Sequence, residues 1–167
     1  MNSLFGRLLV VDDNEMNRDM LARRLERKGY VVGVAEGAQQ LLQRTKQDGT
    51  DLVLLDVEMP GVSGLEALKT LREAYSLIEL PVIMVTAKSQ SEDIVKALDL
   101  GANDYLTKPV DFPVALARIA TQLSQKRAQE AAKAFAVSLR DASPKKESGR
   151  GKGTAPRNNS KTAAPVK

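Results

Sequence analysis

The sequence predicts an α/β fold in which a parallel β-sheet is covered by helices on both faces. Five short runs rich in branched aliphatic residues alternate along the chain with segments of helical periodicity, a pattern typical of repeated βα units. The runs are almost continuously apolar, as strands buried on both faces usually are. Because crossovers between parallel strands are right-handed, the helices are expected on each side of a doubly wound sheet.

The expected strands are the five runs rich in branched aliphatic residues. They lie at 8–13, 31–35, 52–56, 81–87 and 104–109. Their β-branched composition favours extended structure over helix.

The expected helices fill the intervals, because their apolar residues recur three or four positions apart. Three of them are followed by a glycine, at 29, 49 and 101, which is a common helix stop. The periodic positions are Met16, Met20, Leu21 and Leu25 in the first helix, Ala38, Leu41, Leu42 and Thr45 in the second, Leu65, Leu68 and Leu71 in the third, Ile94, Val95 and Leu98 in the fourth, and Leu116, Ile119, Ala120 and Leu123 in the fifth.

The fifth helix is expected to continue beyond the folded domain. The segment SQKRAQEAAKAFAVSLR consists largely of good helix formers, although Lys126 and Glu130 interrupt a heptad counted from Leu116. It is either a signalling helix or weak coiled coil, or a solvated extension that frays. We expect a domain over 1–125, a helical extension over 126–141 and a disordered tail over 142–167, which is rich in Gly, Pro, Ser and Lys.

Composition excludes several kinds of site. The 167 residues are 43% hydrophobic and 28% charged, as in an ordinary globular protein. There is no cysteine and no histidine. Their absence rules out disulfides, thiolate or imidazole metal sites, a cysteine nucleophile and a Ser-His-Asp triad. A metal would therefore be a hard cation held by oxygen, namely magnesium, manganese or calcium.

The termini bear on location and partners. Two aspartates follow the N-terminus too soon for a signal peptide, and no apolar run approaches the length of a membrane span, so we expect a cytoplasmic protein without membrane insertion. From residue 141 onward seven basic residues face two acidic ones. This stretch has no aromatic residue to stack on bases and no helix-turn-helix pattern, which argues against nucleic-acid binding and leaves a linker to an output module or a solubilising tail.

Polar residues stand where four of the strands end. Asp12 and Asp13 end the first, Asp56 the third, Thr86 the fourth and Lys108 the fifth. The carboxyl ends of parallel strands share one edge of the sheet, where ligands bind. Three clustered carboxylates repel one another unless a cation such as Mg²⁺ is present. Asp56, alone on a central strand, is the best candidate for a nucleophile that forms an acyl phosphate.

Plainer explanations exist for each of these residues. Asp12 and Asp13 could cap the helix that starts near Glu15. Lys108 could be solvated, and Thr86 could be an ordinary β-branched strand residue.

Four stretches together carry a family resemblance. LLVVDDNEMNR, LVLLDVEMPGVSG, VIMVTA and GANDYLTKP resemble, in order and spacing over residues 6–125, the receiver domains of bacterial two-component response regulators, the CheY-like family. The resemblance implies a flavodoxin-like fold, with five parallel strands in the order 2-1-3-4-5 and five helices.

The resemblance also implies roles for the strand-end residues. Asp56 would be the phosphoacceptor, taking its phosphoryl group from the phosphohistidine of a sensor histidine kinase or phosphotransfer protein. Asp13 and Asp56 would bind Mg²⁺, or Mn²⁺, with the backbone carbonyl of Glu58, and Asp12 would act mostly through metal-bound water. Lys108 would contact the phosphoryl oxygens.

A switch is implied as well. Thr86 would hydrogen-bond the phosphoryl group and Tyr105 would rotate inward, although a tyrosine there could also be plain core. The peptide bond before Pro109 would be cis. The switch would remodel the face formed by the fourth helix, fifth strand and fifth helix, a surface for a phosphorylation-dependent homodimer. That face would include Lys96, Asp99, Asp104, Tyr105 and Arg118.

Two residues near the site are candidate modulators of phosphoryl lifetime. Glu58 and Lys88 stand two positions after Asp56 and Thr86. Their side chains could form an ion pair that shields the phosphoryl group from water, or both could point to solvent, where such a pair has little effect.

The sequence therefore predicts a phosphoacceptor response regulator that modifies only itself. The alternatives are an interaction-only receiver that is not phosphorylated in the cell, and the receiver piece of a larger regulator. An aspartyl phosphatase is disfavoured, because such enzymes carry an aspartate where this chain has Glu58, and because a cap region is missing.

Overall fold

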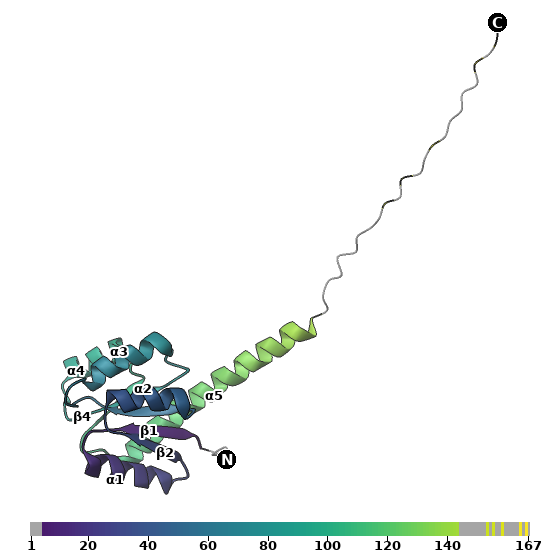
Figure 1. The fold of residues 1–167 in the computed structure, drawn as a ribbon. Coiled ribbons are helices and arrows are strands. Elements are labelled where there is room, and N and C mark those ends of the chain that lie inside the picture. Colours follow the sequence, from purple (N-terminus) through teal and green to yellow (C-terminus); the bar gives the residue numbers. More distant parts are fainter. Residues whose placement is uncertain are drawn as a thin grey trace.

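The computed structural model describes residues 5–143 and, beyond them, positions 153, 155, 158, 164 and 166. Strands and helices alternate along the chain, as Figure 1 shows. Most of the tail expected at 142–167 lies outside the described residues. The elements are β1 (Arg7–Val11), α1 (Glu15–Glu26), β2 (Val31–Ala35), α2 (Ala38–Gln47), β3 (Leu52–Asp56), α3 (Gly64–Ala74), β4 (Val82–Thr86), α4 (Ser91–Asp99), β5 (Asp104–Thr107) and α5 (Phe112–Ala142).

The five strands form one parallel sheet in the order β2-β1-β3-β4-β5, which confirms the predicted topology. Strands β2 and β3 have the predicted bounds, whereas β1, β4 and β5 end one or two residues earlier than expected. The difference arises because Asp12, Asp13, Ala87, Lys108 and Pro109 belong to the loops at the carboxyl edge of the sheet.

The sheet separates two apolar cores, because side chains alternate between its faces. Leu55 and Met84 point into the core beneath α2, α3 and α4. Their neighbours Leu54 and Ile83 point into the core beneath α1 and α5. All four side chains are buried, so the central strands are apolar on both faces, as their sequence indicates.

The buried face of α1 differs from the prediction. Met16 and Met20 are 78% and 56% exposed, while Arg18, Ala22 and Leu25 are buried. At about 100° per residue, nine residues carry Met16 to the side opposite Leu25, so the two could not share one face. A similar difference occurs in α4, where Ala97 is buried and the periodic Val95 and Leu98 are exposed.

Arg72 fastens the end of α3 to the loops that precede β4 and β5. Its Nε donates to the carbonyl of Gly101 (2.7 Å), and its Nη1 donates to that of Leu80 (2.9 Å). Its Nη2 donates to Oδ1 of Asn103 (3.0 Å), which also accepts from the amide of Val82 (2.9 Å). Burial lowers the pKa of Arg72, but these bonds satisfy the guanidinium. The amino edge of the sheet is thereby tied together.

Helix α5 runs for 31 residues, and its first part packs on the sheet. The packed part ends at Lys126, whose Nζ donates to the carboxylate (3.3 Å) and the carbonyl (3.4 Å) of Asp51. Beyond Lys126 the helix projects away from the domain (Figure 1). None of the helices in the described part of the chain combines the length and hydropathy of a membrane span.

Candidate functional site

Strand register brings the predicted carboxylates together. Val11 pairs with Leu55, so Asp12, the next residue after β1, comes level with Asp56 at the end of β3. One carboxylate oxygen from each of Asp12, Asp13 and Asp56 lies within 4.8 Å of the others. Asp12 and Asp56 are buried, whereas Asp13 is exposed. The convergence expected from the strand ends is therefore present.

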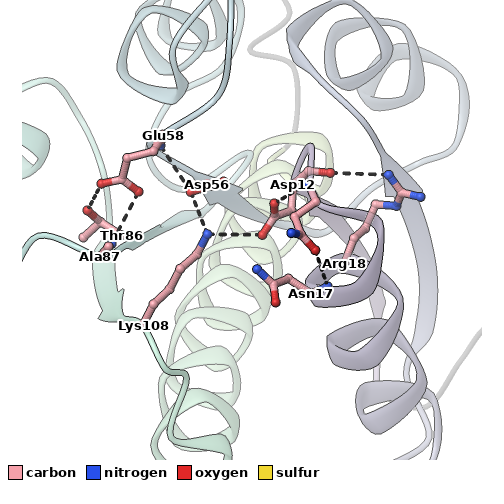
Figure 2. Close-up of polar contacts among 9 residues, drawn as sticks. Asp12, Asn17, Arg18, Asp56, Glu58, Thr86, Ala87 and Lys108 are labelled. Atoms are coloured by element: carbon pink, nitrogen blue, oxygen red, sulfur yellow. Dashed lines mark hydrogen bonds and ion pairs between the residues drawn. The ribbon is translucent and has the colours of Figure 1, made fainter.

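Lys108 reaches this cluster from the loop after β5, as Figure 2 shows. Its Nζ lies 3.1 Å from Oδ1 of Asp56 and 3.3 Å from Oδ2 of Asp12. The Lys108–Pro109 peptide bond is cis. Burial alone would lower the pKa of Lys108, but the hydrogen bond and charge of Asp56, together with Asp12, outweigh it and raise the pKa. The lysine is thus a fixed positive charge between two buried carboxylates.

Asp56 has the most perturbed acidity of the cluster. Its side chain is 2% exposed, and its pKa is raised from 3.8 to about 7. Burial is the main cause and the charge of Asp12 adds to it, while Lys108 and the backbone amide of Glu58, 3.2 Å from Oδ1, act in the opposite direction. A carboxyl with this pKa titrates near neutrality and binds either a proton or a cation.

The raised pKa of Asp56 predicts a pH-dependent stability effect. Between pH 4 and 7 the folded state holds a proton on Asp56 that the unfolded chain has lost, so the free energy of unfolding falls as pH rises through this range. Asp56→Asn removes the titration. We expect it to stabilise the metal-free protein by about 1–2 kcal/mol at pH 8 and by much less at pH 5. Urea denaturation in EDTA at both pH values measures this, and an equal gain at both would contradict it.

The three carboxylates fit a hard divalent cation. Ligands of an octahedral Mg²⁺ lie about 3–4.2 Å apart when each is about 2.1 Å from the ion, so a small contraction of the cluster would suffice. The described carboxylates offer oxygen alone, and the sequence has no histidine or cysteine to favour zinc. The donor set thus matches magnesium or manganese.

The turn after β3 shows how local sequence builds the site. The amide of Gly64 donates to the carbonyl of Val57 (3.0 Å), which draws the start of α3 against the end of β3. A Cβ on Gly64 would lie 2.0 Å from the carbonyl oxygen of Asp56, so no other residue fits without a shift of the backbone. Ser63 and Glu66 then form a capping box that starts α3.

The carboxylate of Glu58 binds Thr86, the predicted switch residue, and does not pair with Lys88. Its carboxylate accepts from Oγ1 of Thr86 (2.6 Å) and from the amide of Ala87 (3.3 Å), as Figure 2 shows. Burial raises the pKa of Glu58, but these hydrogen bonds outweigh it and the net shift is downward. Lys88 pairs instead with Asp93 (3.9 Å). The ion pair considered between Glu58 and Lys88 is therefore wrong for this structure.

The start of α1 settles the capping question. Asn14 is the N-cap, and its side chain accepts from the amide of Asn17 (3.0 Å). Asp12 instead accepts from the amide of Asn14 (2.9 Å) through Oδ1, which leaves Oδ2 for Lys108. The alternative that Asp12 or Asp13 caps this helix is wrong. Sequence reasoning also missed the buried Arg18, which donates to the carbonyl of Asp12 (3.4 Å).

Within the predicted output face, Arg118 contacts both Asp104 and Tyr105. Its guanidinium lies 3.6 Å from the carboxylate of Asp104, donates to the carbonyl of Tyr105 and lies 5.2 Å from the centroid of the tyrosine ring. Tyr105 is half-buried and packs against the core beneath α2, α3 and α4. The ring therefore has a cation on one side and apolar contacts on the other.

A cleft of about 580 Å³ opens beside the carboxylates, between α1 and the loop that leads into α5. Its lining combines the polar residues Asp12, Asn17 and Lys108 with the apolar Met20 and Phe112. The guanidinium of Arg24 stacks 4.1 Å above the Phe112 ring at its rim. Asp12 and Lys108 are thus shared between the cleft and the carboxylate cluster.

Comparison with known proteins identifies the family. The response regulator receiver domain model matches residues 8–120. The chain is 43% identical over 120 residues to the uncharacterized transcriptional regulatory protein YkoG of Bacillus subtilis (strain 168), a match that covers 72% of this chain and 52% of the relative. The chain spans about half the length of the curated relatives it matches.

Solved structures agree with this assignment. A CheY-like receiver domain protein from Methanospirillum hungatei JF-1 superposes with a TM-score of 0.69 at 30% identity, covering 75% of this chain and 98% of that one. The receiver domain of Saccharomyces cerevisiae Ssk1, crystallised with the histidine phosphotransfer protein Ypd1, superposes with a TM-score of 0.62 at 30% identity, covering 70% and 88%. The chain belongs to the response regulator receiver domain family.

Proposed function

We propose that this chain is a phosphoacceptor whose Asp56 takes a phosphoryl group from the phosphohistidine of a sensor histidine kinase or a phosphotransfer protein. The observation that carries the proposal is the position of Asp56, a buried carboxylate with a pKa of about 7, between two further aspartates and 3.1 Å from the Lys108 ammonium. Because such a kinase draws its phosphoryl group from ATP, we propose that the reaction takes place in the cytoplasm.

In the proposed reaction, a carboxylate oxygen of Asp56 attacks the phosphorus atom of the donor. The P–N bond of the phosphoimidazole breaks, its electron pair returns to the imidazole nitrogen, and a P–O bond forms the acyl phosphate. Asp13 and Asp56, with the carbonyl of Glu58, would hold Mg²⁺, assisted by Asp12. When bound, Mg²⁺ would supply charge neutralisation at the phosphoryl oxygens. Lys108 would contribute a second positive charge there.

The hydrogen bond between Thr86 and Glu58 supports a switch. A phosphoryl oxygen on Asp56 would compete with Glu58 for the Thr86 hydroxyl, which now donates to the glutamate at 2.6 Å. Movement of Thr86 would vacate space into which Tyr105 could turn, away from Arg118. The face of α4, β5 and α5 would then change, which is the proposed route to a phosphorylation-dependent homodimer.

Glu58 is in this view a modulator of the switch. The role proposed for Lys88 is smaller, because its ion-pair partner Asp93 stands on α4 rather than at the phosphorylation site. Both residues would act on the lifetime of the acyl phosphate rather than on its formation.

The outer face of α1 supports docking of the phosphodonor. The exposed Met16 and Met20 lie beside Arg23, Arg24 and Arg27, which together line a shallow surface next to the cleft. Methionine adapts to apolar partners, and the arginines favour an acidic rim. The Ssk1 receiver domain crystallised with Ypd1 shows that a protein of this family meets a phosphotransfer protein.

A second reading is that the chain is the receiver piece of a longer regulator. It rests on the curated relatives, of which the chain covers about half. The basic segment after α5 would then be the linker to an output module. The acceptor chemistry at Asp56 would be the same in both cases.

The phosphoacceptor proposal is tested by intact-mass spectrometry after incubation with acetyl phosphate. With Mg²⁺ we expect one phosphoryl adduct, and with excess EDTA none, because the carboxylate cluster needs the cation. Asp56→Asn is the matched control and should show no adduct under either condition. Absence of an adduct from a protein that binds Mg²⁺ would instead favour an interaction-only receiver.

A further inference from the structure

The last part of α5 carries apolar side chains that its own domain leaves exposed. The domain-facing side of the helix comprises Ala115, Ile119 and Leu123, and it ends with Lys126, which is held by Asp51. Every described residue from 127 to 143 is exposed. Phe135 and Leu139 are among them, with exposures of 66% and 56%.

These apolar residues form a seam of their own rather than a continuation of the buried face. From Ala128 onward, apolar residues recur at alternating steps of four and three, which is the spacing of a coiled-coil seam. The seam is displaced by two residues from Lys126, about 200° around the helix, so it faces away from the side that packs on the domain. Its members are Ala128, Ala132, Phe135, Leu139 and Ala142.

The charged residues that interrupt the first heptad lie off this seam. Lys126 and Glu130 break a heptad counted from Leu116, but neither lies on the seam that starts at Ala128. They fall, with Lys133 and Arg140, on the opposite side of the helix. The seam itself is free of charge over its whole length.

The positions that flank the seam favour a second copy of the same chain as its partner. In coiled coils the flanking residues set partner choice by charge. Here they are Gln129, Ala131, Ala136 and Ser138, all neutral and mostly small. When the helix pairs with a second copy, these neutral positions bring no like charges together. The small side chains also let the two backbones approach closely.

We propose that residues 125–142 of α5 pair antiparallel with the same residues of a second copy. In that arrangement Phe135 lies opposite the partner's Ala132, and Leu139 lies opposite the partner's Ala128. Every level then joins a large residue to a small one, which packs evenly. A parallel pair would stack Phe135 on itself and Ala132 on itself, which leaves the seam wide at one level and hollow at the next.

Charge supports the antiparallel direction. The charged residues nearest the seam on one side are Arg127, which also donates to the carbonyl of Phe5 in its own domain, and Asp141, at the two ends of the seam. An antiparallel pair brings these opposite charges to within one residue of the same level, whereas a parallel pair sets each against its own kind. A parallel pair would also bring together two C-terminal segments with seven basic residues each. The antiparallel pair keeps them apart.

This interface is separate from the proposed phosphorylation. It starts where the packed part of α5 ends, whereas Asp56 lies at the carboxyl edge of the sheet. The paired segment is short, about 27 Å at 1.5 Å per residue, so we expect a dissociation constant in the micromolar range. Because no phosphoryl group is needed, Asp56→Asn should dimerise like the wild type.

Sedimentation equilibrium of the full chain tests the seam. Phe135→Glu should raise the dissociation constant of the dimer roughly tenfold or more, because it places a charge at the centre of the apolar seam. Val137→Glu is the matched control, since Val137 is 51% exposed on the same helix but on the opposite side. It should change the constant by less than about twofold. A wild type that stays monomeric up to about 1 mM, or equal effects of the two variants, would overturn the proposal.

Cysteine cross-linking tests the direction, because the natural sequence has no cysteine. Gln125→Cys and Ala142→Cys are placed so that the antiparallel pair sets one against the other without touching Phe135 or Leu139. Oxidation of a mixture should give disulfides between the two different variants, identified by mass. Cross-links that join like with like, or none at all in a sample shown to be dimeric, would refute the antiparallel arrangement.

Discussion

Gly64→Ala is expected to lower the free energy of unfolding by about 3 kcal/mol, at the upper end of the cost of overpacking. The new Cβ would lie 2.0 Å from the carbonyl oxygen of Asp56 and 2.8 Å from the Cα of Val57. These are backbone atoms at and just after the end of β3, so no side-chain rotation relieves the clash. Either β3 or the start of α3 must move, and the bond from Gly64 to the carbonyl of Val57 is lost. Urea denaturation of both proteins measures the difference.

Gly37→Ala is the matched control for this substitution. A Cβ at Gly37 would meet nothing within 4 Å, and its φ of −175° is extended backbone that any residue adopts. Gly37 is the N-cap of α2, where alanine is less favoured than glycine, so we expect a loss of no more than about 1 kcal/mol. If Gly64→Ala proved as stable as Gly37→Ala, the close approach of α3 to Asp56 would be wrong. The displaced Asp56 should also make Gly64→Ala slower to form its acyl phosphate.

Lys108→Ala is expected to slow formation of the acyl phosphate by about 100- to 1000-fold. The ammonium stands 3.1 Å from the Asp56 carboxylate, where negative charge accumulates on the transferred group. Loss of one such preorganised charge commonly has an effect of this size. The rate is measured from the growth of the phosphoryl adduct with acetyl phosphate and saturating Mg²⁺.

The effect of Lys108 can be separated from metal binding. Removal of a cation from beside Asp12 and Asp56 should leave Mg²⁺ affinity unchanged or increase it, because the lysine repels the metal. Lys69→Ala, an exposed lysine on α3, is the control and should react at the wild-type rate. A Lys108→Ala protein that no longer binds Mg²⁺ would show that the lysine holds the cluster together instead.

Much of the fold and the core of the site follow from the sequence because they depend on local patterns. The apolar runs and the helical spacing predict the strands and their covering helices. The parallel arrangement then forces Asp12, Asp13, Asp56 and Lys108 to the same edge of the sheet. No contact between distant side chains needs to be known for this step.

The features that were missed depend on side-chain direction. The contact between Glu58 and Thr86 joins residues 28 positions apart and is set by the register of β3 with β4. The exposure of Met16 depends on which side of α1 meets the sheet, and spacing alone does not fix that. The seam in α5 was obscured because the helix changes its buried side at Lys126, where the domain ends.

The two edges of the sheet differ in how firmly their loops are held. At the amino edge, Arg72 binds carbonyls or side chains of the loops before β4 and β5, so those loops are fixed. At the carboxyl edge, Glu58 and Thr86 hold each other by a single side-chain bond that a competing oxygen can replace. Substitutions far apart usually act additively. Evolution or an engineer can therefore retune the timing and output of the signal at one edge while the other preserves the fold.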